Sequence, residues 1–169
     1  MSDLSPTGAA LILDRDDTLV VDSGYMSGDH PIVFVPGAVD LLVAATQRGI
    51  PLFIATNQSG ISRGMYGIAD MHYFNARLLR RLEEYSVPIL DLVFCPHGPN
   101  DGCLCRKPSP GLLLQLQDRH GIKLKNSVVV GDKASDEQLG KLHCREGIRI
   151  DQKGFSPALI ARILSEFSS

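Results

Sequence analysis

AALILDRDDTL, residues 9–19, joins a short apolar run to three acidic residues. Residues 9–13 have the length and the aliphatic character of a buried strand. Asp14 and Asp16 follow that run directly, so both are predicted at the carboxyl end of the strand. Ligands of parallel α/β sheets bind beyond the carboxyl ends of the strands. The pattern therefore predicts a functional site immediately after the first strand.

The rest of the chain alternates between apolar strand patterns and helix patterns. The expected strands cover residues 51–55, 89–94, 127–130 and 147–150, and the expected helices cover residues 37–49, 70–85, 109–121, 135–142 and 156 onward. Such alternation is typical of a mostly parallel sheet covered on both faces. We expect an α/β, three-layer Rossmann-like fold without a large cap domain. No repeat or linker divides the chain, so residues 1–169 are predicted to form one domain.

Local signals set the expected ends of several helices. Gly49 and Gly121 are suited to end two of them, and Asp70 is suited to cap a third. The apolar face of the helix over residues 109–121 is predicted to consist of four leucines, Leu112, Leu113, Leu114 and Leu116.

Composition excludes several classes of protein. The 169 residues carry a net charge of −2, which gives no basic field for nucleic acid. No apolar run approaches the ~18 residues of a membrane span. The N-terminal segment, residues 1–8, lacks the basic start and apolar stretch of a signal peptide. We therefore expect a cytoplasmic protein that binds neither nucleic acid nor membrane.

Polar and acidic residues follow several of the predicted strands. They are Asp14, Asp16, Thr56, Asn57, Cys95 and Asp132, with Asp136 as a further acidic candidate. A single aspartate after a strand commonly caps a helix or makes a turn. Several at equivalent strand ends would place like charges in one pocket, which either raises their pKa values or requires a cation. Oxygen ligands of this kind suit Mg²⁺.

Three of the four cysteines gather around a histidine. Cys95, His97, Cys103 and Cys105 lie within eleven residues and form a Cys3His set, which is suited to tetrahedral Zn²⁺. The loop over residues 95–105 is poor in apolar residues, so a metal cross-link would order it. Four protein ligands leave no open position, so this Zn²⁺ is predicted to be structural. Cys144 stands apart and is expected to be a small core residue.

The order of these groups resembles the four motifs of the haloacid dehalogenase superfamily. The motifs correspond to residues 13–19, residues 55–57, Lys107 and residues 130–132. The resemblance implies that Asp14 is the nucleophile and Asp16 the general acid and base. It further implies that Thr56 binds the phosphoryl group, that Lys107 neutralises it, and that Asp14, Asp16 and Asp132 hold Mg²⁺. The implied activity is phosphate hydrolysis through an aspartyl-phosphate, a form of covalent catalysis.

A narrower resemblance covers most of the chain. Residues 57–64, NQSGISRG, then 95–97, CPH, and 105–108, CRKP, are similar to the D-glycero-D-manno-heptose 1,7-bisphosphate 7-phosphatases of nucleotide-activated heptose biosynthesis. The resemblance implies a sugar phosphate substrate cleaved at its C7 phosphate. The substrate-binding residues that it implies are Asp22, Ser23, Gly24, Tyr25, Asn57, Gln58, Ser59, Arg106 and Lys133.

This sequence departs from the pattern at two places. Asp17 stands where that group usually has glycine, and it adds a negative charge near the site. The segment between the cysteine pairs, residues 98–102, is shorter than in some relatives. A change in the pocket wall is therefore expected.

Two alternatives remain open at this point. Histidinol-phosphate phosphatases share the zinc loop and the aspartate motif, although residues 59–64 resemble the heptose group more. A non-catalytic receiver domain also uses an acidic rim, but it would carry its phosphorylated aspartate after the third strand, where Cys95 stands. The small size and the absence of an obvious interface favour a monomer.

Overall fold

The computed structural model of the chain describes residues 8–168, so most of the N-terminal segment discussed above lies outside the described residues. Its five strands form one sheet in the order β3-β2-β1-β4-β5, and every neighbouring pair is parallel. The strands are β1 (Leu11–Leu13), β2 (Leu52–Asn57), β3 (Ile89–Cys95), β4 (Val128–Gly131) and β5 (Glu146–Arg149). The helices are α1 (Ala38–Gln47), α2 (Ile68–Glu83), α3 (Gly111–His120), α4 (Ala134–His143) and α5 (Pro157–Ser165), with a 3₁₀ turn at Leu124–Asn126.

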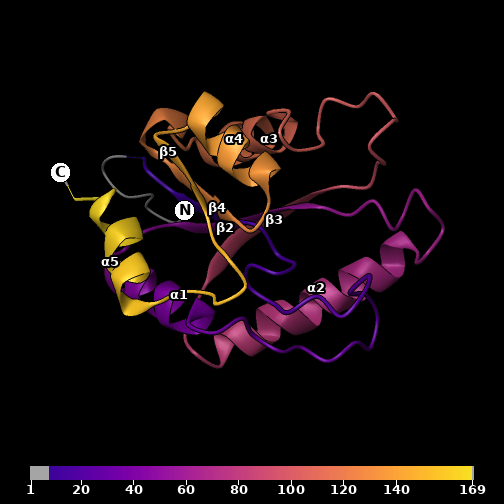
Figure 1. Cartoon of the computed structure of the whole chain (residues 1–169), viewed down its shortest axis with the longest axis horizontal. Coiled ribbons are helices and arrows are strands. Elements are labelled where there is room, and N and C mark those ends of the chain that lie inside the picture. The colour runs from indigo at the N-terminus through magenta and orange to yellow at the C-terminus, as the bar shows by residue number, and fades with distance from the viewer. Residues whose placement is uncertain (1–7, 169) are drawn as a thin grey trace.

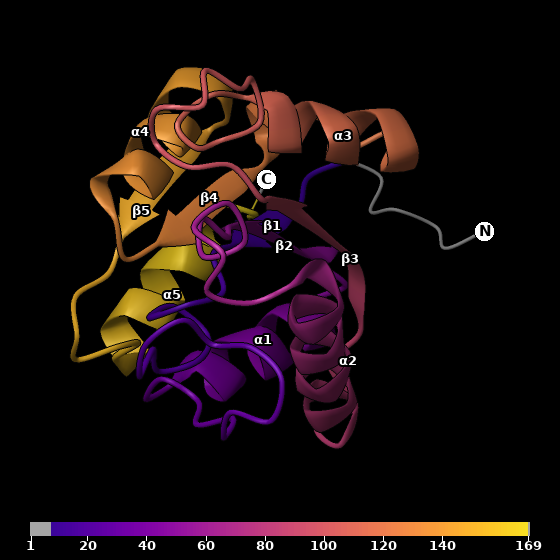
Figure 2. The ribbon, with the colours of Figure 1, turned by 90° about the vertical axis from the view of Figure 1, so that its right-hand side faces the viewer.

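Helices cover both faces of the sheet, which makes three layers (Figure 1). Helices α1, α2 and α5 lie on one face, and α3 and α4 lie on the other, as the turned view also shows (Figure 2). Alternate residues of a strand point to opposite faces. Leu11 and Leu13 accordingly join the first apolar cluster, while Ile12 joins the second. The predicted three-layer α/β fold is confirmed.

Two expected local features differ from those in the structure. The N-cap of α2 is Gly67, and Asp70 stands at the third helical position, where its carboxylate accepts a hydrogen bond from the Gly67 amide at 2.9 Å. This is half of a capping box. Leu114 is 51% exposed and does not belong to the buried face of α3, which Leu112, Leu113 and Leu116 form.

Long connections gather at the carboxyl ends of the strands. Residues 14–37 follow β1, residues 58–67 follow β2, and residues 96–110 follow β3. None of them carries a domain of its own, as expected for a protein without a large cap. Cys144 is buried at the end of α4, as predicted. Among residues 8–168, no helix is both long and apolar enough to cross a membrane.

Candidate active site

The three central strands bring the first group of predicted residues together. Leu13 pairs with Ile54 of β2 and with Val130 of β4, so these strands run level with one another. Asp14 therefore leaves β1 between Thr56, near the end of β2, and Asp132, just after β4. The expectation that these residues share one edge of the sheet agrees with this register.

Lys107 reaches this edge from the connection after β3. Its Nζ donates to Asp14 Oδ1 at 2.8 Å and to the Ala55 carbonyl at 2.7 Å, and it lies 2.6 Å from Asp136 Oδ1. All three side chains are buried. Burial alone would raise the pKa of Asp14, but the charge and hydrogen bond of Lys107 hold that pKa below its usual value. One buried ammonium is thus shared by two buried carboxylates.

A third carboxylate completes an acidic group. One oxygen each from Asp14, Asp132 and Asp136 lies within 4.8 Å of the others. Burial, followed by the nearby charge of Asp14, raises the pKa of Asp132 to about 6. Gly131 permits this packing, because a Cβ atom there would lie 2.2 Å from the Asp136 carboxyl carbon. The oxygen donors and the excess negative charge of the group fit Mg²⁺.

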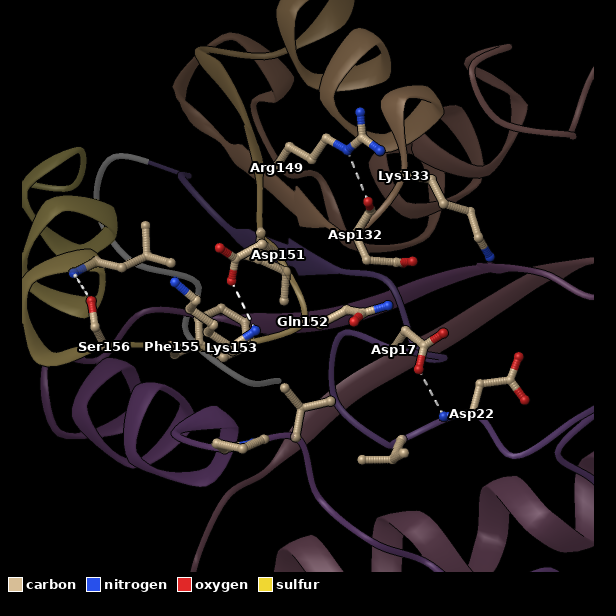
Figure 3. A pocket seen from close by; sticks show the side chains of 16 residues that line it. Asp17, Asp22, Asp132, Lys133, Arg149, Asp151, Gln152, Lys153, Phe155 and Ser156 are labelled. Atoms are coloured by element: carbon tan, nitrogen blue, oxygen red, sulfur yellow. Dashed lines mark hydrogen bonds between the residues drawn. The ribbon is translucent and has the colours of Figure 1, made fainter.

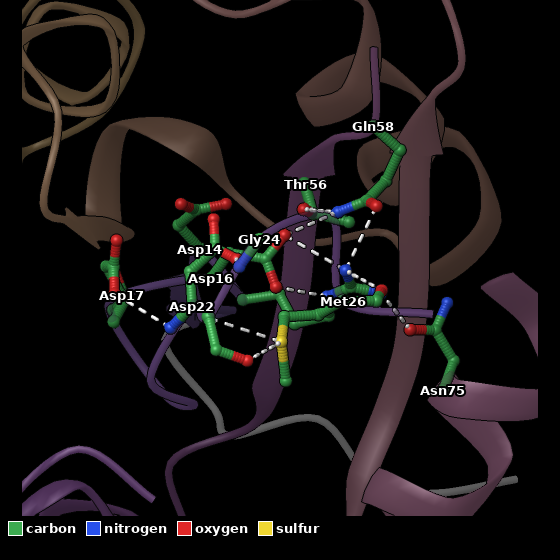
Figure 4. Close-up of polar contacts among 12 residues, drawn as sticks. Asp14, Asp16, Asp17, Asp22, Gly24, Met26, Thr56, Gln58 and Asn75 are labelled. Carbon is green, nitrogen blue, oxygen red and sulfur yellow. Dashed lines mark hydrogen bonds and ion pairs between the residues drawn. The ribbon is translucent and has the colours of Figure 1, made fainter. Parts of the chain in front are cut away.

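Asp16 lies close by, and its carboxylate is turned toward Gln58 (Figure 4). Arg15 donates from Nε to one oxygen at 2.8 Å and from Nη2 to the other at 2.9 Å, and Gln58 donates to the second oxygen at 2.9 Å. Burial raises the pKa of Asp16 against the opposing charge of Arg15. The side chain of Asp16 does not belong to the acidic group, so its remaining oxygen for a metal is the main-chain carbonyl.

Gln58 connects Asp16 to Thr56. Its Nε2 donates to Asp16 and, at 2.8 Å, to the Thr56 hydroxyl. Its Oε1 accepts from Arg15 at 3.0 Å and from the Tyr66 hydroxyl at 2.5 Å. Two donors and two lone pairs are the full capacity of an amide. The buried Gln58 amide therefore has no unused hydrogen-bond donor or acceptor for a substrate in this geometry.

Asn57 is also engaged inside the protein. Its Oδ1 accepts from the main-chain amide of Lys107 at 3.0 Å, and its Nδ2 donates to the Lys107 carbonyl at 3.3 Å. Asn57 pairs in register with Cys95 on β3. This side chain fixes the backbone that carries Lys107.

The predicted loop after β1 lies at the surface. Asp22, Ser23, Gly24 and Tyr25 are exposed. The Tyr25 hydroxyl accepts from the Arg63 guanidinium at 3.1 Å, so this loop contacts the turn after β2. These side chains are therefore accessible to a ligand.

That turn holds the second predicted loop segment. The Ser59 carbonyl accepts from the Arg63 amide at 3.1 Å and from the Ser62 hydroxyl at 3.0 Å. The rings of Tyr25 and Tyr66 lie 6.3 Å apart. A Cβ atom on Gly60 would lie 2.2 Å from the Tyr66 ring and 2.7 Å from the Tyr25 ring, so glycine is needed for this contact.

Asp17 adopts a left-handed backbone, with φ of 57°. Such a conformation favours glycine, and aspartate is among the side chains that tolerate it best. The Asp17 carboxylate accepts a hydrogen bond from the Asp22 amide at 2.9 Å. The departure from the usual glycine thus supplies a contact that orders the start of the surface loop.

The second candidate metal site lies beside the first. The ligand atoms of Cys95, His97, Cys103 and Cys105 all lie within 4.8 Å of one another. The Cys95 sulfur lies 3.6 Å from that of Cys103 and 3.2 Å from that of Cys105, and the Cys105 sulfur lies 3.3 Å from His97 Nδ1. Disulfide sulfurs are about 2.05 Å apart, whereas sulfurs bound to one tetrahedral Zn²⁺ are ~3.8 Å apart. The four free side chains fit Zn²⁺.

Arg106 follows the cysteine cluster directly and precedes Lys107. One nitrogen of its guanidinium donates to the His97 carbonyl at 3.2 Å. The conformation of the zinc loop therefore determines where Arg106 and Lys107 lie.

A wide cleft of about 1130 Å³ opens on the Asp132 side of the acidic group (Figure 3). Lys133, Arg149 and Lys153 line it together with an apolar floor that includes Phe155. Arg149 donates to the main-chain carbonyl of Asp132 at 2.9 Å, which holds that residue in place. Burial opposes the charge of Lys133, but Asp14 and the neighbouring carboxylates raise its pKa.

Four residues of this region were not predicted as site residues. Arg15, Tyr66 and Asn75 belong to the polar network around Asp16, and Asp136 was only a further acidic candidate. An isolated arginine or asparagine is ordinarily a surface residue. Only Asp136 carried a signal, because it lies four residues after Asp132 at the start of a predicted helix.

Comparison with known proteins gives a consistent result. Residues 10–155 match the polynucleotide kinase 3 phosphatase family. A D-glycero-beta-D-manno-heptose-1,7-bisphosphate 7-phosphatase from Pseudomonas aeruginosa is 39% identical over 75% of this chain and 71% of its own length. The protein of the same name from Helicobacter pylori is 40% identical over 79% and 78%.

Solved structures agree with these relatives. The D,D-heptose 1,7-bisphosphate phosphatase from B. bronchiseptica, complexed with magnesium and phosphate, has a TM-score of 0.78 at 29% identity. The alignment covers 94% of this chain and 99% of that one. A putative HAD-like phosphatase from Mesorhizobium loti has a TM-score of 0.79 at 30% identity and covers 97% of this chain and 88% of its own.

Proposed function

The chain belongs to the D-glycero-D-manno-heptose-1,7-bisphosphate 7-phosphatase family, and we propose that it hydrolyses the C7 phosphate of a heptose 1,7-bisphosphate in nucleotide-activated heptose biosynthesis. One observation carries the proposal beyond the likeness. A buried aspartate, Asp14, is held by Lys107 next to the carboxylate of Asp132, with which it can share Mg²⁺. This arrangement is suited to covalent phosphoryl transfer.

The proposed reaction begins with attack by a carboxylate oxygen of Asp14 on phosphorus. The new oxygen–phosphorus bond forms as the bond to the sugar oxygen breaks, and Asp16 gives its proton to that oxygen. Asp16 then takes a proton from water, whose oxygen attacks the aspartyl-phosphate and releases Asp14. Lys107 offsets charge on the phosphoryl oxygens, and Thr56 donates a hydrogen bond to them.

Mg²⁺ would be held by the carboxylates of Asp14 and Asp132 and by the main-chain carbonyl of Asp16. When bound, it supplies charge neutralisation for the phosphoryl oxygens. The carboxylate of Asp136 forms an ion pair with Lys107 and accepts a hydrogen bond from the main-chain amide of Lys133 at 3.1 Å. We assign Asp136 to orienting Lys107.

The remaining predicted residues divide by exposure. Asp22, Ser23, Gly24, Tyr25 and Ser59 lie on loops where a sugar can reach them, while Lys133 is exposed and Arg106 is half-buried. Asn57 and Gln58 are used internally, so we assign them to positioning instead of direct binding. We further propose a monomeric, single-domain, cytoplasmic enzyme that binds neither nucleic acid nor membrane; light scattering after size exclusion tests the monomer.

The substrate is tested by a kinetic panel in which Arg106→Ala is compared with the wild type. We expect higher kcat/KM for a heptose bisphosphate than for histidinol phosphate. Arg106 is proposed to bind the phosphate that stays on the sugar. A hydrogen bond to a charged group contributes about 1.5–3 kcal/mol. Arg106→Ala should therefore lower kcat/KM roughly ten- to a hundredfold for the bisphosphate and less for a heptose monophosphate.

Two controls accompany that panel. Arg106→Lys keeps the charge without the planar fork and should lie between the other two proteins. Relatives named for the beta and the alpha anomer are 39% and 38% identical to this chain, so both anomers are included. Higher kcat/KM for histidinol phosphate would contradict the substrate proposal in favour of the histidinol-phosphate alternative. Family membership argues against the receiver-type alternative.

The zinc loop is tested by elemental analysis. We expect about one zinc per chain, retained after mild chelation that removes magnesium. Cys103→Ser should lose the zinc, melt at a lower temperature and lose activity, because the same loop carries Arg106 and Lys107. Cys144→Ser is the matched control, since Cys144 is buried outside the cluster and should leave the zinc content unchanged. Full activity in a zinc-free protein would show that the metal does not organise the site.

A further inference from the structure

Arg15 is the largest completely buried polar side chain close to the nucleophile. Its exposed fraction is 0%, although arginine is almost never fully buried without partners. Its guanidinium donates to both carboxylate oxygens of Asp16, to the Met26 carbonyl at 2.9 Å, to Gln58 at 3.0 Å and to Asn75 Oδ1 at 2.8 Å. Because the side chain is completely buried, it does not face the space in which a substrate would bind.

We propose that Arg15 is a positioning residue that fixes the carboxyl group of Asp16 beside the reacting phosphate. The proposal rests on the phosphatase function proposed above. Proton transfer to the leaving oxygen requires the carboxyl group within hydrogen-bond reach. Asp16 lies on a loop, and the two-pronged contact with Arg15 restrains both of its oxygens at once.

The guanidinium is itself held by elements outside the nucleophile loop. Asn75 on α2 binds one nitrogen, and the guanidinium carbon lies 4.8 Å from the centre of the Phe74 ring on the same helix. The Met26 carbonyl belongs to the connection that carries the exposed residues 22–25. Helix α2 thus acts as a rigid support for the proton donor.

Gln58 extends the same network to the phosphate side. It accepts from Arg15 and donates to both Asp16 and the Thr56 hydroxyl (Figure 4). The Thr56 hydroxyl accepts that bond, so its own hydrogen is directed away from Gln58 and is available to a phosphoryl oxygen. Arg15 therefore orients the proton donor directly and the phosphate contact through one intermediate.

The test uses substrates that depend differently on the proton donor. Benzyl phosphate and 4-nitrophenyl phosphate both carry an aromatic ring, but only the alkoxide of the first needs protonation to leave. Asn75→Leu removes the outer anchor of Arg15 without altering Asp14, Asp16, Thr56 or Lys107. A displacement of about 1 Å costs up to roughly a hundredfold in rate. We expect a loss of about tenfold or more in kcat for benzyl phosphate and less than about threefold for 4-nitrophenyl phosphate.

Four further proteins make the test specific. Leu78→Ala is the matched control, because Leu78 is buried on α2 and touches the apolar core. It should lower the melting temperature, but its loss in kcat should be the same for benzyl phosphate and for 4-nitrophenyl phosphate. Arg15→Lys should show the same separation as Asn75→Leu. When Asp16 is already replaced by asparagine, adding Asn75→Leu should not increase the difference in kcat loss between the two substrates, because Asn75 acts through Asp16.

Equal losses for both substrates in Asn75→Leu would overturn the proposal, as would the same separation in Leu78→Ala. Persistence of the separation in the Asp16→Asn background would also overturn it. Wild-type turnover of the two simple phosphates is measured first. If the wild type released no phosphate from a heptose 1,7-bisphosphate, the proposed phosphatase function would fail, which is distinct from failure of the positioning role.

Discussion

Asp14→Asn is expected to give a folded protein that has lost roughly 10⁴-fold or more of its kcat, because an amide cannot form the aspartyl-phosphate. The substitution is nearly isosteric, and Lys107 keeps its contacts with Asp136 and the Ala55 carbonyl. Initial rates of phosphate release measure the loss. Intact-protein mass spectrometry after an acid quench should detect a phosphorylated chain in the wild type and none in the variant.

Two observations would contradict this role for Asp14. One is activity within tenfold of the wild type in a preparation free of back-mutated or deamidated protein. The other is a phosphorylated chain in the variant, which would place the nucleophile elsewhere. Asp16→Asn is the control for general damage to the loop, because it should retain more activity toward 4-nitrophenyl phosphate than toward an alkyl phosphate.

Lys107→Met is expected to cause the largest loss of stability among the site variants. The substitution leaves the carboxylates of Asp14 and Asp136 buried without their shared cation. Removing one partner of a buried ion pair costs about 3–5 kcal/mol of unfolding free energy. Urea denaturation without Mg²⁺ measures the difference, and the same variant should lose at least roughly a hundredfold in kcat.

The loss in Lys107→Met should depend on pH in a definite direction. Lys107 holds the pKa of Asp14 below its usual value in the folded protein. The stability that this contact contributes is present above the unfolded pKa of aspartate and is lost as pH falls through the folded pKa. The difference between wild type and variant should therefore be largest near neutral pH and shrink toward acid pH.

Lys133→Met is the matched control for that experiment. Lys133 is exposed and adjoins the same carboxylates, but the described contacts of its side chain include no hydrogen bond or short ion pair. We expect a change below about 1 kcal/mol, as for exposed charges generally. Equal losses in the two variants would show that the general charge of the site, and not the buried contact of Lys107, determines stability.

The sequence predicts the order and type of the main strands and helices correctly from apolar runs, helical periodicity and capping residues, although the strand expected over residues 147–150 has a weaker signal. Two details were wrong for local reasons. Leu114 differs from Leu112 by two residues, or about 200° around a helix, so it points away from the face that Leu112 and Leu116 share. Asp70 caps α2 from inside its first turn, because the flexible Gly67 can take the N-cap position.

The candidate site was predicted unevenly. Residues at strand ends, such as Asp14 and Asp132, follow from topology, since parallel strands place them at one edge. The clustering of the four zinc ligands follows from their proximity in sequence. The bonds of Asn57 and Gln58 could not be inferred, because they join residues far apart in the chain. The burial of Arg15 depends on Asn75 and on the Met26 carbonyl, and no local pattern predicts that meeting.

The left-handed backbone at Asp17 limits which residues can replace one another at this position during evolution. At a φ of 57°, glycine fits freely, aspartate and asparagine fit with little strain, and β-branched side chains are strongly disfavoured. A lineage can therefore exchange glycine for aspartate here and keep the same loop shape, gaining the contact with the Asp22 amide. The residue types that can occur at this position are then limited by the backbone conformation. A glycine here in relatives does not indicate a catalytic requirement.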